Sequence, residues 1–215
     1  MQPTDFQPLA YVYQPAPGPA RATLLLLHGT GGDERDLLPL AARFGPGLNV
    51  LSLRGNVQEG GMPRFFRRLG MGVFDEADVV FRTHELADFL PKVAAKEGFD
   101  PAQLIAVGYS NGANIAGGLL LLHPGLLAGA VLWRPMQPLV QQVPAFAAPR
   151  PVPVYFAPGS HDPTVRPAAT EAYAVLLTQG GYDLTRHDAP AGHNLTPIDL
   201  DGAVAWLHAH FPAAK

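Results

Sequence analysis

Short apolar segments alternate along this chain with longer segments in which apolar residues recur every three or four positions. A continuous apolar run is typical of a strand buried on both faces of a parallel sheet, and mainly apolar runs predict strands at residues 23–27, 49–53, 103–107, 127–133 and 152–157. A further strand is expected at residues 182–187. The helical spacing predicts helices at residues 33–44, 78–97, 111–122, 167–179 and 197–210. An edge strand is expected at residues 6–13, and Pro91 is expected to end the second helix early or to kink it.

Strands that alternate with helices in this way indicate βαβ units, and therefore an α/β fold with a mostly parallel sheet that helices cover on both faces. Two longer connections interrupt the alternation: residues 54–75, rich in Gly, Arg, Phe and Met, and the proline-rich residues 135–151. The sequence contains no internal repeat or linker, so a single domain over residues 1–215 is expected. Ligands of such sheets bind outside the carboxyl ends of the strands, which directs attention to the residues just after each strand.

The composition narrows the possible functions. Of the 215 residues, 47% are hydrophobic and 15% are charged, which is ample for a buried core, and a formal net charge of −3 without a basic run argues against nucleic acid as a partner. The chain has no cysteine, which excludes disulfides, cysteine zinc sites and a thiol nucleophile. The first residues do not form a secretory signal, and the apolar run at residues 24–27 is too short for a membrane helix. A cytoplasmic protein without a membrane partner is therefore expected.

The residues that follow the predicted strand 103–107 form a motif for a nucleophilic serine. Gly108, Ser110 and Gly112 lie where this strand turns into the helix 111–122, which is the context of a nucleophile elbow. The sharp turn would hold the serine forward in a strained conformation, and side chains at the two glycines would collide where strand and helix meet. Because the chain has three serines and 23 glycines, chance alone would place glycine at both flanking positions in about 3% of such chains.

A serine hydroxyl needs a base to accept its proton, and in this kind of fold the acid and then the base follow the serine along the chain. His193, in the loop after the last predicted strand, is the candidate base, and His187 at the end of that strand is the alternative. Asp162 follows a late apolar strand and is the candidate acid, which would hold the imidazole tautomer and stabilise the imidazolium. An N-cap of the next helix is the alternative role for Asp162, and Asp188 is the alternative acid.

The segment His28-Gly29-Thr30-Gly31-Gly32 ends the first buried strand, where this kind of fold supplies one donor of an oxyanion hole. We expect the two donors to be the backbone amides of Thr30 and Asn111. A tight strand–helix turn or a phosphate-binding loop is the alternative, but the chain has neither a G-x-G-x-x-G motif nor a P-loop lysine. Removing one such donor typically costs about 2.7–4 kcal/mol of transition-state stabilisation.

Together these motifs resemble the phospholipase/carboxylesterase family of α/β hydrolases, which includes acyl-protein thioesterases and small bacterial carboxylesterases. The matching segments follow the same order over almost the whole chain: residues 26–34, 108–112, 159–162 and 191–193. The resemblance implies the α/β-hydrolase fold and hydrolysis of carboxylic esters or thioesters with no metal and no organic cofactor. It looks closest to bacterial members that carry Arg-Gly followed by Met-Pro-Arg-Phe-Phe, here residues 54–55 and 62–66. The Trp-Phe-Asp stretch usual in the thioesterases is missing from this loop, which disfavours an acyl-protein substrate.

The connection between residues 133 and 152 is too short for a helical cap domain, so no cap domain is expected and the two long loops must shape the pocket. The candidates for an apolar substrate pocket, each with local core packing as the alternative, are Phe65, Phe66, Phe74 and Met136. Three arginines in the same loop could attract an anionic group or could simply be solvated: Arg64, Arg67 and Arg68.

The expected function is that of a serine carboxylesterase, which hydrolyses small carboxylic esters through an acyl-enzyme on Ser110. One alternative is an acyl thioesterase or lysophospholipase, which would use the same residues. Another is a non-catalytic protein that keeps the fold and binds a ligand in its pocket. The expected partner is a small-molecule ester, and turnover of a chromogenic ester would distinguish catalysis from binding.

Overall fold

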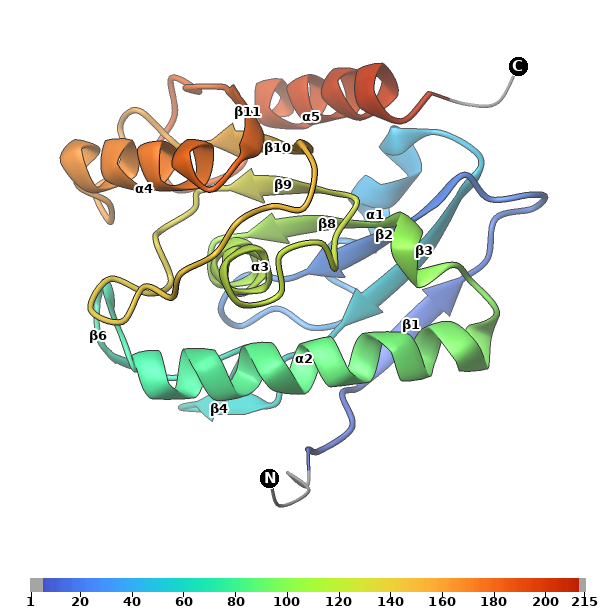
Figure 1. Ribbon diagram of the computed structural model, residues 1–215, viewed down its shortest axis with the longest axis horizontal. Coiled ribbons are helices and arrows are strands. Elements are labelled where there is room, and N and C mark those ends of the chain that lie inside the picture. Colours follow the sequence, from blue (N-terminus) through green and yellow to red (C-terminus); the bar gives the residue numbers. More distant parts are fainter. Residues whose placement is uncertain (1–5, 213–215) are drawn as a thin grey trace.

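Residues 6–212 are described by the computed structural model, and their centre is a seven-stranded sheet (Figure 1). The strand order is β1-β3-β2-β8-β9-β10-β11, with β1 antiparallel to β3 and every other neighbouring pair parallel. The strands are β1 (Tyr11–Gln14), β2 (Ala22–Leu27), β3 (Leu48–Leu53), β8 (Leu104–Tyr109), β9 (Gly129–Trp133), β10 (Val152–Ala157) and β11 (Tyr182–Arg186). The mostly parallel sheet expected from the apolar runs is confirmed.

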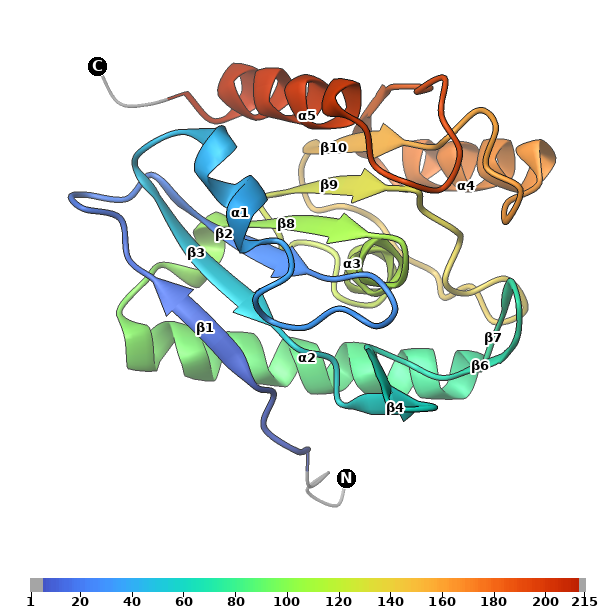
Figure 2. The same ribbon diagram turned by 180° about the vertical axis from the view of Figure 1, so that it is seen from behind.

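Helices cover both faces of this sheet, as Figures 1 and 2 show from opposite sides. One face carries α2 (Glu76–Glu97), α3 (Asn111–Leu122) and α4 (Pro167–Gln179), and the other carries α1 (Leu38–Ala41), the 3-10 helix η1 (Ala42–Phe44) and α5 (Pro197–His210). A second 3-10 helix, η2 (Pro101–Gln103), leads into β8. The side chains of β2 alternate between the two layers, with Leu25 and Leu27 in one core and Leu24 and Leu26 in the other. Burial on both faces explains why this strand is continuously apolar.

The order of the strands reverses between β2 and β8. From β2 the chain continues to β3 on one side, and from β8 it continues to β9 on the other side. The connections therefore leave the two strand ends in opposite directions and open a crevice there. Leu27 at the end of β2 is level with Gly108 near the end of β8. This register brings Thr30 and Ser110, which follow these two strands, to the same part of the crevice.

Residues 54–75 were expected to be an irregular loop, but they contain two hairpins. The strand β4 (Val57–Glu59) pairs with β5 (Met62–Arg64), and β6 (Arg68–Gly70) pairs with β7 (Val73–Phe74). Gly60 and Gly61 form the tip of the first hairpin with φ angles of 58° and 84°. Two positive φ angles are what a tight hairpin turn needs, so the Gly-Gly pair was a sequence signal for this element.

The helix expected at residues 33–44 begins only at Leu38. The side chain of Asp33 accepts a hydrogen bond from the backbone N–H of Arg35 at 2.7 Å. Such a local bond to an aspartate favours a turn over the first turn of a helix. The edge strand expected at residues 6–13 is likewise shorter and spans Tyr11–Gln14.

Pro91 was expected to end the helix early or to kink it, but α2 does not end there and continues to Glu97. The proline is exposed, whereas Leu90 and Val93 are buried in the core. Packing of this apolar face offsets the hydrogen bond that proline removes from the helix. Neither α2 nor any other helix within residues 6–212 has the length and apolar character needed to cross a membrane.

Candidate active site

Ser110 lies on the tight turn between β8 and α3 in a conformation that few residues adopt. Its φ is 52° and its ψ is −113°, which is strained for a residue with a side chain. The backbone N–H of Ser110 donates to Trp133 O at 2.9 Å, so β9 supports the turn. A Cβ at Gly108 would lie 2.5 Å from Gly112 O, and one at Gly112 would overlap the carbonyl group of Leu27. The strained serine and the need for glycine on both sides agree with the expected elbow.

The structure brings the side chains of Ser110, His193 and Asp162 together in one chain of hydrogen bonds. His193 Nε2 lies 2.8 Å from Ser110 Oγ, and His193 Nδ1 lies 2.7 Å from Asp162 Oδ2. His193 comes from the loop between β11 and α5, and Asp162 comes from the loop between β10 and α4. Three segments far apart in the sequence therefore meet at the carboxyl end of the sheet.

The alternative residues lie elsewhere. The ring of His187 stacks on Tyr155 with centroids 5.6 Å apart, and Asp188 forms an ion pair at the surface. Asp162 does not cap the following helix, because the N-cap of α4 is Arg166. The geometry thus favours His193 and Asp162 as the partners of the serine.

Thr164 completes the surroundings of Asp162, although no motif in the sequence marked it. Its hydroxyl and its backbone N–H donate to Asp162 Oδ1 at 2.6 and 2.9 Å. Burial raises the pKa of Asp162, but the hydrogen bonds from Thr164 and His193 outweigh burial and hold the pKa below its ordinary value. Asp162 is therefore an anion at neutral pH, as the stabilisation of an imidazolium at His193 requires. An aspartate two residues before a threonine is a usual turn pattern and was the available signal.

Arg134, which sequence analysis also missed, holds the loop that carries His193. Its guanidinium donates to the carbonyl oxygens of Gly192 and Asn194, on either side of the histidine, at 2.8 and 2.9 Å. The same group forms a bidentate pair with Asp199 of α5 at 2.8 and 2.7 Å, and both side chains are fully buried. Because a guanidinium is planar and rigid, it fixes the loop relative to α5. All of these partners are distant in sequence, so no local pattern reveals the arrangement.

Thr30 and Asn111 line the cavity beside the serine, and their backbone N–H groups donate to no other group within residues 6–212. The neighbouring N–H of Gly31 already donates to a carbonyl of β5 at 2.9 Å, which leaves Thr30 as the available donor of its loop. The side chains are occupied, since Asn111 Oδ1 accepts from Phe65 N–H at 2.7 Å and Thr30 Oγ1 accepts from Arg64 Nη1 at 2.5 Å. The two amides thus remain free for an oxyanion.

Ser110 and His193 line a cavity of about 370 Å³, which is named the catalytic lobe. Two of the four expected pocket residues, Phe74 and Met136, line it. Phe65 and Phe66 do not, because both are buried in the core beneath the hairpins. The ring of Phe65 packs on His28 with centroids 4.7 Å apart, and Phe66 packs edge-on against Phe74 at 5.0 Å. Phe65 and Phe66 are therefore not the substrate contacts that had been expected. Burial of their apolar rings in the core stabilises the fold instead.

A second cavity of about 480 Å³, the outer lobe, adjoins the catalytic lobe. The two lobes share Met71, Gly72, Phe74, Met136 and Thr164. The outer lobe extends between the β6–β7 hairpin, the loop after β9 and α4, and much of its remaining lining is apolar. The cleft is thus bilobed, and Phe74 and Met136 lie where the lobes meet.

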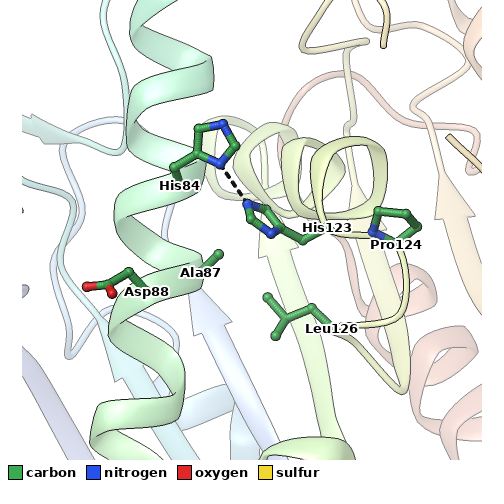
Figure 3. Close-up of a pocket in the computed structure, with 6 residues that line it drawn as sticks. All are labelled: His84, Ala87, Asp88, His123, Pro124 and Leu126. Atoms are coloured by element: carbon green, nitrogen blue, oxygen red, sulfur yellow. Dashed lines mark hydrogen bonds between the residues drawn. The ribbon is translucent and has the colours of Figure 1, made fainter. Parts of the chain in front are cut away.

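A further cavity of about 450 Å³ lies against α2 and the end of α3 and shares no lining residue with either lobe (Figure 3). There His84 and His123 point toward each other, with Nδ1 of the first 2.8 Å from Nε2 of the second. The carboxylate of Asp88 points away from this pair and binds Lys92. Within residues 6–212 no three His, Cys, Asp or Glu side chains gather in a way that could hold a metal ion.

Comparison with known proteins found relatives over almost the whole chain. The chain is 43% identical over 190 residues to a protein of Bacillus subtilis (strain 168) named putative hydrolase MhqD, a match that covers 88% of this chain and 94% of that one. It resembles the solved Bacillus cereus carboxylesterase at 44% identity and a TM-score of 0.90, with 94% and 95% of the two chains covered. It also resembles a carboxylesterase from Mesorhizobium loti at 32% identity and a TM-score of 0.86, with 93% and 94% covered. No family model matches the chain.

Proposed function

Because this chain belongs to the phospholipase/carboxylesterase family of α/β hydrolases, we propose that it is a serine carboxylesterase that hydrolyses small carboxylic esters through an acyl-enzyme on Ser110. Its relatives support ester hydrolysis in general. The observation that carries the serine mechanism is the hydrogen-bond chain from Ser110 through His193 to Asp162. A serine hydroxyl is a weak nucleophile until an adjacent base accepts its proton, and these contacts meet that need.

In the first half of the reaction, Ser110 Oγ attacks the carbonyl carbon of the ester while His193 Nε2 accepts the hydroxyl proton. The negative charge that develops on the carbonyl oxygen accepts hydrogen bonds from the N–H groups of Thr30 and Asn111, and the N-terminus of α3 adds favourable potential. Asp162 stabilises the imidazolium without taking its proton. The bond to the alcohol then breaks, the alcohol leaves with the proton from His193, and the acyl group stays on Ser110.

In the second half, water attacks the acyl carbon while His193 Nε2 accepts a proton from the water. The same two amides stabilise the second oxyanion. The bond between the acyl carbon and Ser110 Oγ breaks, the serine regains its proton from His193, and the carboxylic acid leaves. The reactants are a small ester and water, and this scheme uses no metal or organic cofactor.

Labelling with a fluorophosphonate probe tests the nucleophile. We expect one adduct per chain, located on Ser110 by peptide mass spectrometry, because Ser110 is the serine bonded to a histidine that an aspartate orients. Ser110→Ala should abolish both labelling and hydrolysis of a short chromogenic ester. Ser160→Ala, at an exposed serine, is the matched control and should leave both unchanged. An adduct on Ser52 or Ser160, or no adduct, would contradict the assignment.

An acyl thioesterase is the second candidate, and the outer lobe is the feature that favours it. Its mainly apolar space of about 480 Å³ could hold part of an acyl chain. The same triad would cleave either bond, so a matched pair of substrates decides: an ethyl ester and an S-ethyl thioester of the same acid. A much higher kcat/KM for the thioester would favour this candidate.

A further inference from the structure

The catalytic lobe is lined by positive side chains without negative ones. Arg64 and Arg68 line it, and none of its lining residues within the described range 6–212 is an aspartate or glutamate. We propose that these two arginines form a subsite for a carboxylate, and that the substrates are esters that carry a carboxylate a few bonds from the scissile carbonyl. This inference rests on the proposed esterase function and specifies its substrate class.

Glu59 is the acid that pairs with both arginines, and it balances only one of them. Its Oε1 accepts from Nε and Nη2 of Arg68 at 2.9 and 2.8 Å, and its Oε2 lies 3.2 Å from Arg64 Nε. The side chain of Arg64 is only 3% exposed, so water screens its charge weakly. Burial, and then repulsion from Arg68, lowers the pKa of Arg64, and the attraction of Glu59 offsets these two effects only in part. One positive charge beside the lobe is therefore unbalanced.

Arg64 is the fixed member of the pair. Its Nε donates to Phe66 O at 3.1 Å, and its Nη1 donates to Thr30 Oγ1 at 2.5 Å. These two neutral acceptors hold the guanidinium in place, but they do not neutralise its charge. Arg64 therefore supplies positive potential next to the loop that carries Thr30, and this potential favours an anion in the lobe.

Arg68 supplies the donor that a ligand can use. It begins β6, and its side chain is 22% exposed. Within residues 6–212 its Nη1 meets only the thioether sulfur of Met71, at 3.5 Å, and such sulfur is a weak acceptor. Met71 is itself exposed on the β6–β7 hairpin, so a carboxylate can displace it. The charge-assisted hydrogen bond that would form is stronger than the contact it replaces.

The size of the lobe limits the distance between the carboxylate and the ester. Ser110 and Arg68 line the same space of about 370 Å³, and a sphere of that volume is about 9 Å across. One small molecule can therefore reach both residues. Monoesters of short dicarboxylic acids and acyl esters of short hydroxy acids have the required form.

The experiment compares charged esters with neutral esters of the same shape. Monomethyl glutarate carries a carboxylate where methyl 5-oxohexanoate carries an acetyl group, so this pair places the charge on the acyl side. Acetoxyacetate and acetoxyacetone place it on the alcohol side. For at least one pair we expect kcat/KM to be about tenfold higher for the charged ester. The preference should shrink as sodium chloride rises from about 0.05 M to about 0.5 M, because salt screens partly exposed charges.

Variants that change the charge test which residues are responsible. Arg68→Gln should lower the ratio of charged to neutral kcat/KM about tenfold, and Arg68→Lys should retain part of it. Glu59→Gln removes the counter-charge and should raise the ratio, which a mere loss of structure would not do. Arg67→Gln is the matched control: Arg67 is 60% exposed, pairs with Asp75 and does not line the lobe. Its ratio should equal that of the wild type.

A binding measurement separates this inference from the proposed function. In Ser110→Ala, isothermal titration calorimetry should show, for at least one of the two pairs, tighter binding of the charged ester than of its neutral partner, and adding Arg68→Gln should remove the difference. Hydrolysis without any preference for the charged ester in either pair overturns the subsite and leaves the esterase function standing. Charge-dependent binding without hydrolysis of any ester supports the subsite and overturns the proposed function. If the protein neither hydrolyses any of the esters nor binds a charged ester more tightly, both the subsite and the proposed function are overturned.

Discussion

Several single residues hold His193 in place for the proposed reaction. Asp162 binds Nδ1, the hydroxyl of Tyr109 donates to His193 O at 3.1 Å, and Arg134 binds the carbonyl groups on either side. A general base must lie within hydrogen-bond reach of the proton that it accepts, and a misplacement of about 1 Å can lower a rate about 100-fold. Arg134 is therefore expected to be a positioning residue, although it does not line the catalytic lobe.

Arg134→Lys tests this role without leaving the buried Asp199 unpaired. The lysine keeps the charge but cannot bind Gly192 and Asn194 together, so we expect kcat to fall about 10- to 100-fold with little change in KM. Steady-state kinetics and thermal unfolding measure the two effects separately. Arg186→Lys, at an exposed arginine on β11, is the matched control and should behave like the wild type. An unchanged kcat in a folded Arg134→Lys protein would show that the loop holds His193 without the guanidinium.

At the scale of elements, hairpins and one irregular loop form the substrate cleft. The loop between β9 and β10 has no secondary structure, yet Glu76 at the start of α2 accepts from the N–H groups of residues 140, 141 and 142 at 2.8, 2.9 and 3.1 Å. Nearer its start, Met136 N–H donates to Asn114 Oδ1 at 2.7 Å. These contacts to two helices hold the loop in place and keep Met136 at the junction of the two lobes.

The division of the cleft predicts the preferred length of the acyl chain. Each buried methylene is worth about 0.8 kcal/mol, so kcat/KM should rise over the first few carbons and then fall once the chain fills the catalytic lobe. Met136→Ala should open the lobes into each other and shift the optimum to longer chains. A series of p-nitrophenyl esters measures the shift, and Leu69→Ala, at an exposed position of β6 that lines neither lobe, is the control. A continued rise to palmitoyl length in the wild type would favour the thioesterase candidate.

At the scale of the whole molecule, the core contains a histidine that must stay neutral. His28 directly follows the central strand β2 and is buried. Its Nδ1 lies 2.6 Å from Gly29 O, and its Nε2 accepts a hydrogen bond from Gly55 N–H at 3.1 Å. Burial lowers the pKa of His28, and burial followed by the charge of His84 lowers that of His123. In both cases the folded protein binds a proton less readily than the unfolded chain does.

The free energy of unfolding should therefore decrease in mild acid. Above pH 6.5, which is about the pKa of a histidine in the unfolded chain, neither state binds the proton and the free energy of unfolding is at its full value. Below it the unfolded chain binds protons that the folded protein excludes, so each such histidine removes up to about 1.4 kcal/mol per pH unit until the folded pKa is reached. Urea unfolding at pH 7.5 and pH 5.5 measures this loss. His28→Asn should reduce the difference between the two pH values, and His161→Asn, at an exposed histidine, should not. An equal difference in all three proteins would show that His28 does not contribute.

The sequence by itself determined the elements whose signal is local. The continuous apolar run of β2 and the apolar segments of α3, α4 and α5 predicted these elements almost to the residue, because burial of an element selects apolar residues along its own sequence, where they can be seen. The glycines around Ser110 likewise indicated the elbow, since only a residue without a side chain fits where β8 meets α3. The order of the motifs also placed Asp162 and His193 at strand ends that converge in a parallel sheet.

Only the tertiary structure decided the features that depend on contacts between distant segments. The rings of Phe65 and Phe66 look suited to a pocket, but the hairpins turn them into the core and leave Phe74 at the cleft. The guanidinium of Arg134 donates hydrogen bonds to Gly192, Asn194 and Asp199, which lie 58 to 65 residues away in the sequence. The charge of the catalytic lobe depends on how few acids pack beside Arg64 and Arg68. The reason is the same in each case: no repeat along the chain encodes the neighbours of a side chain, because packing brings them together from separate elements.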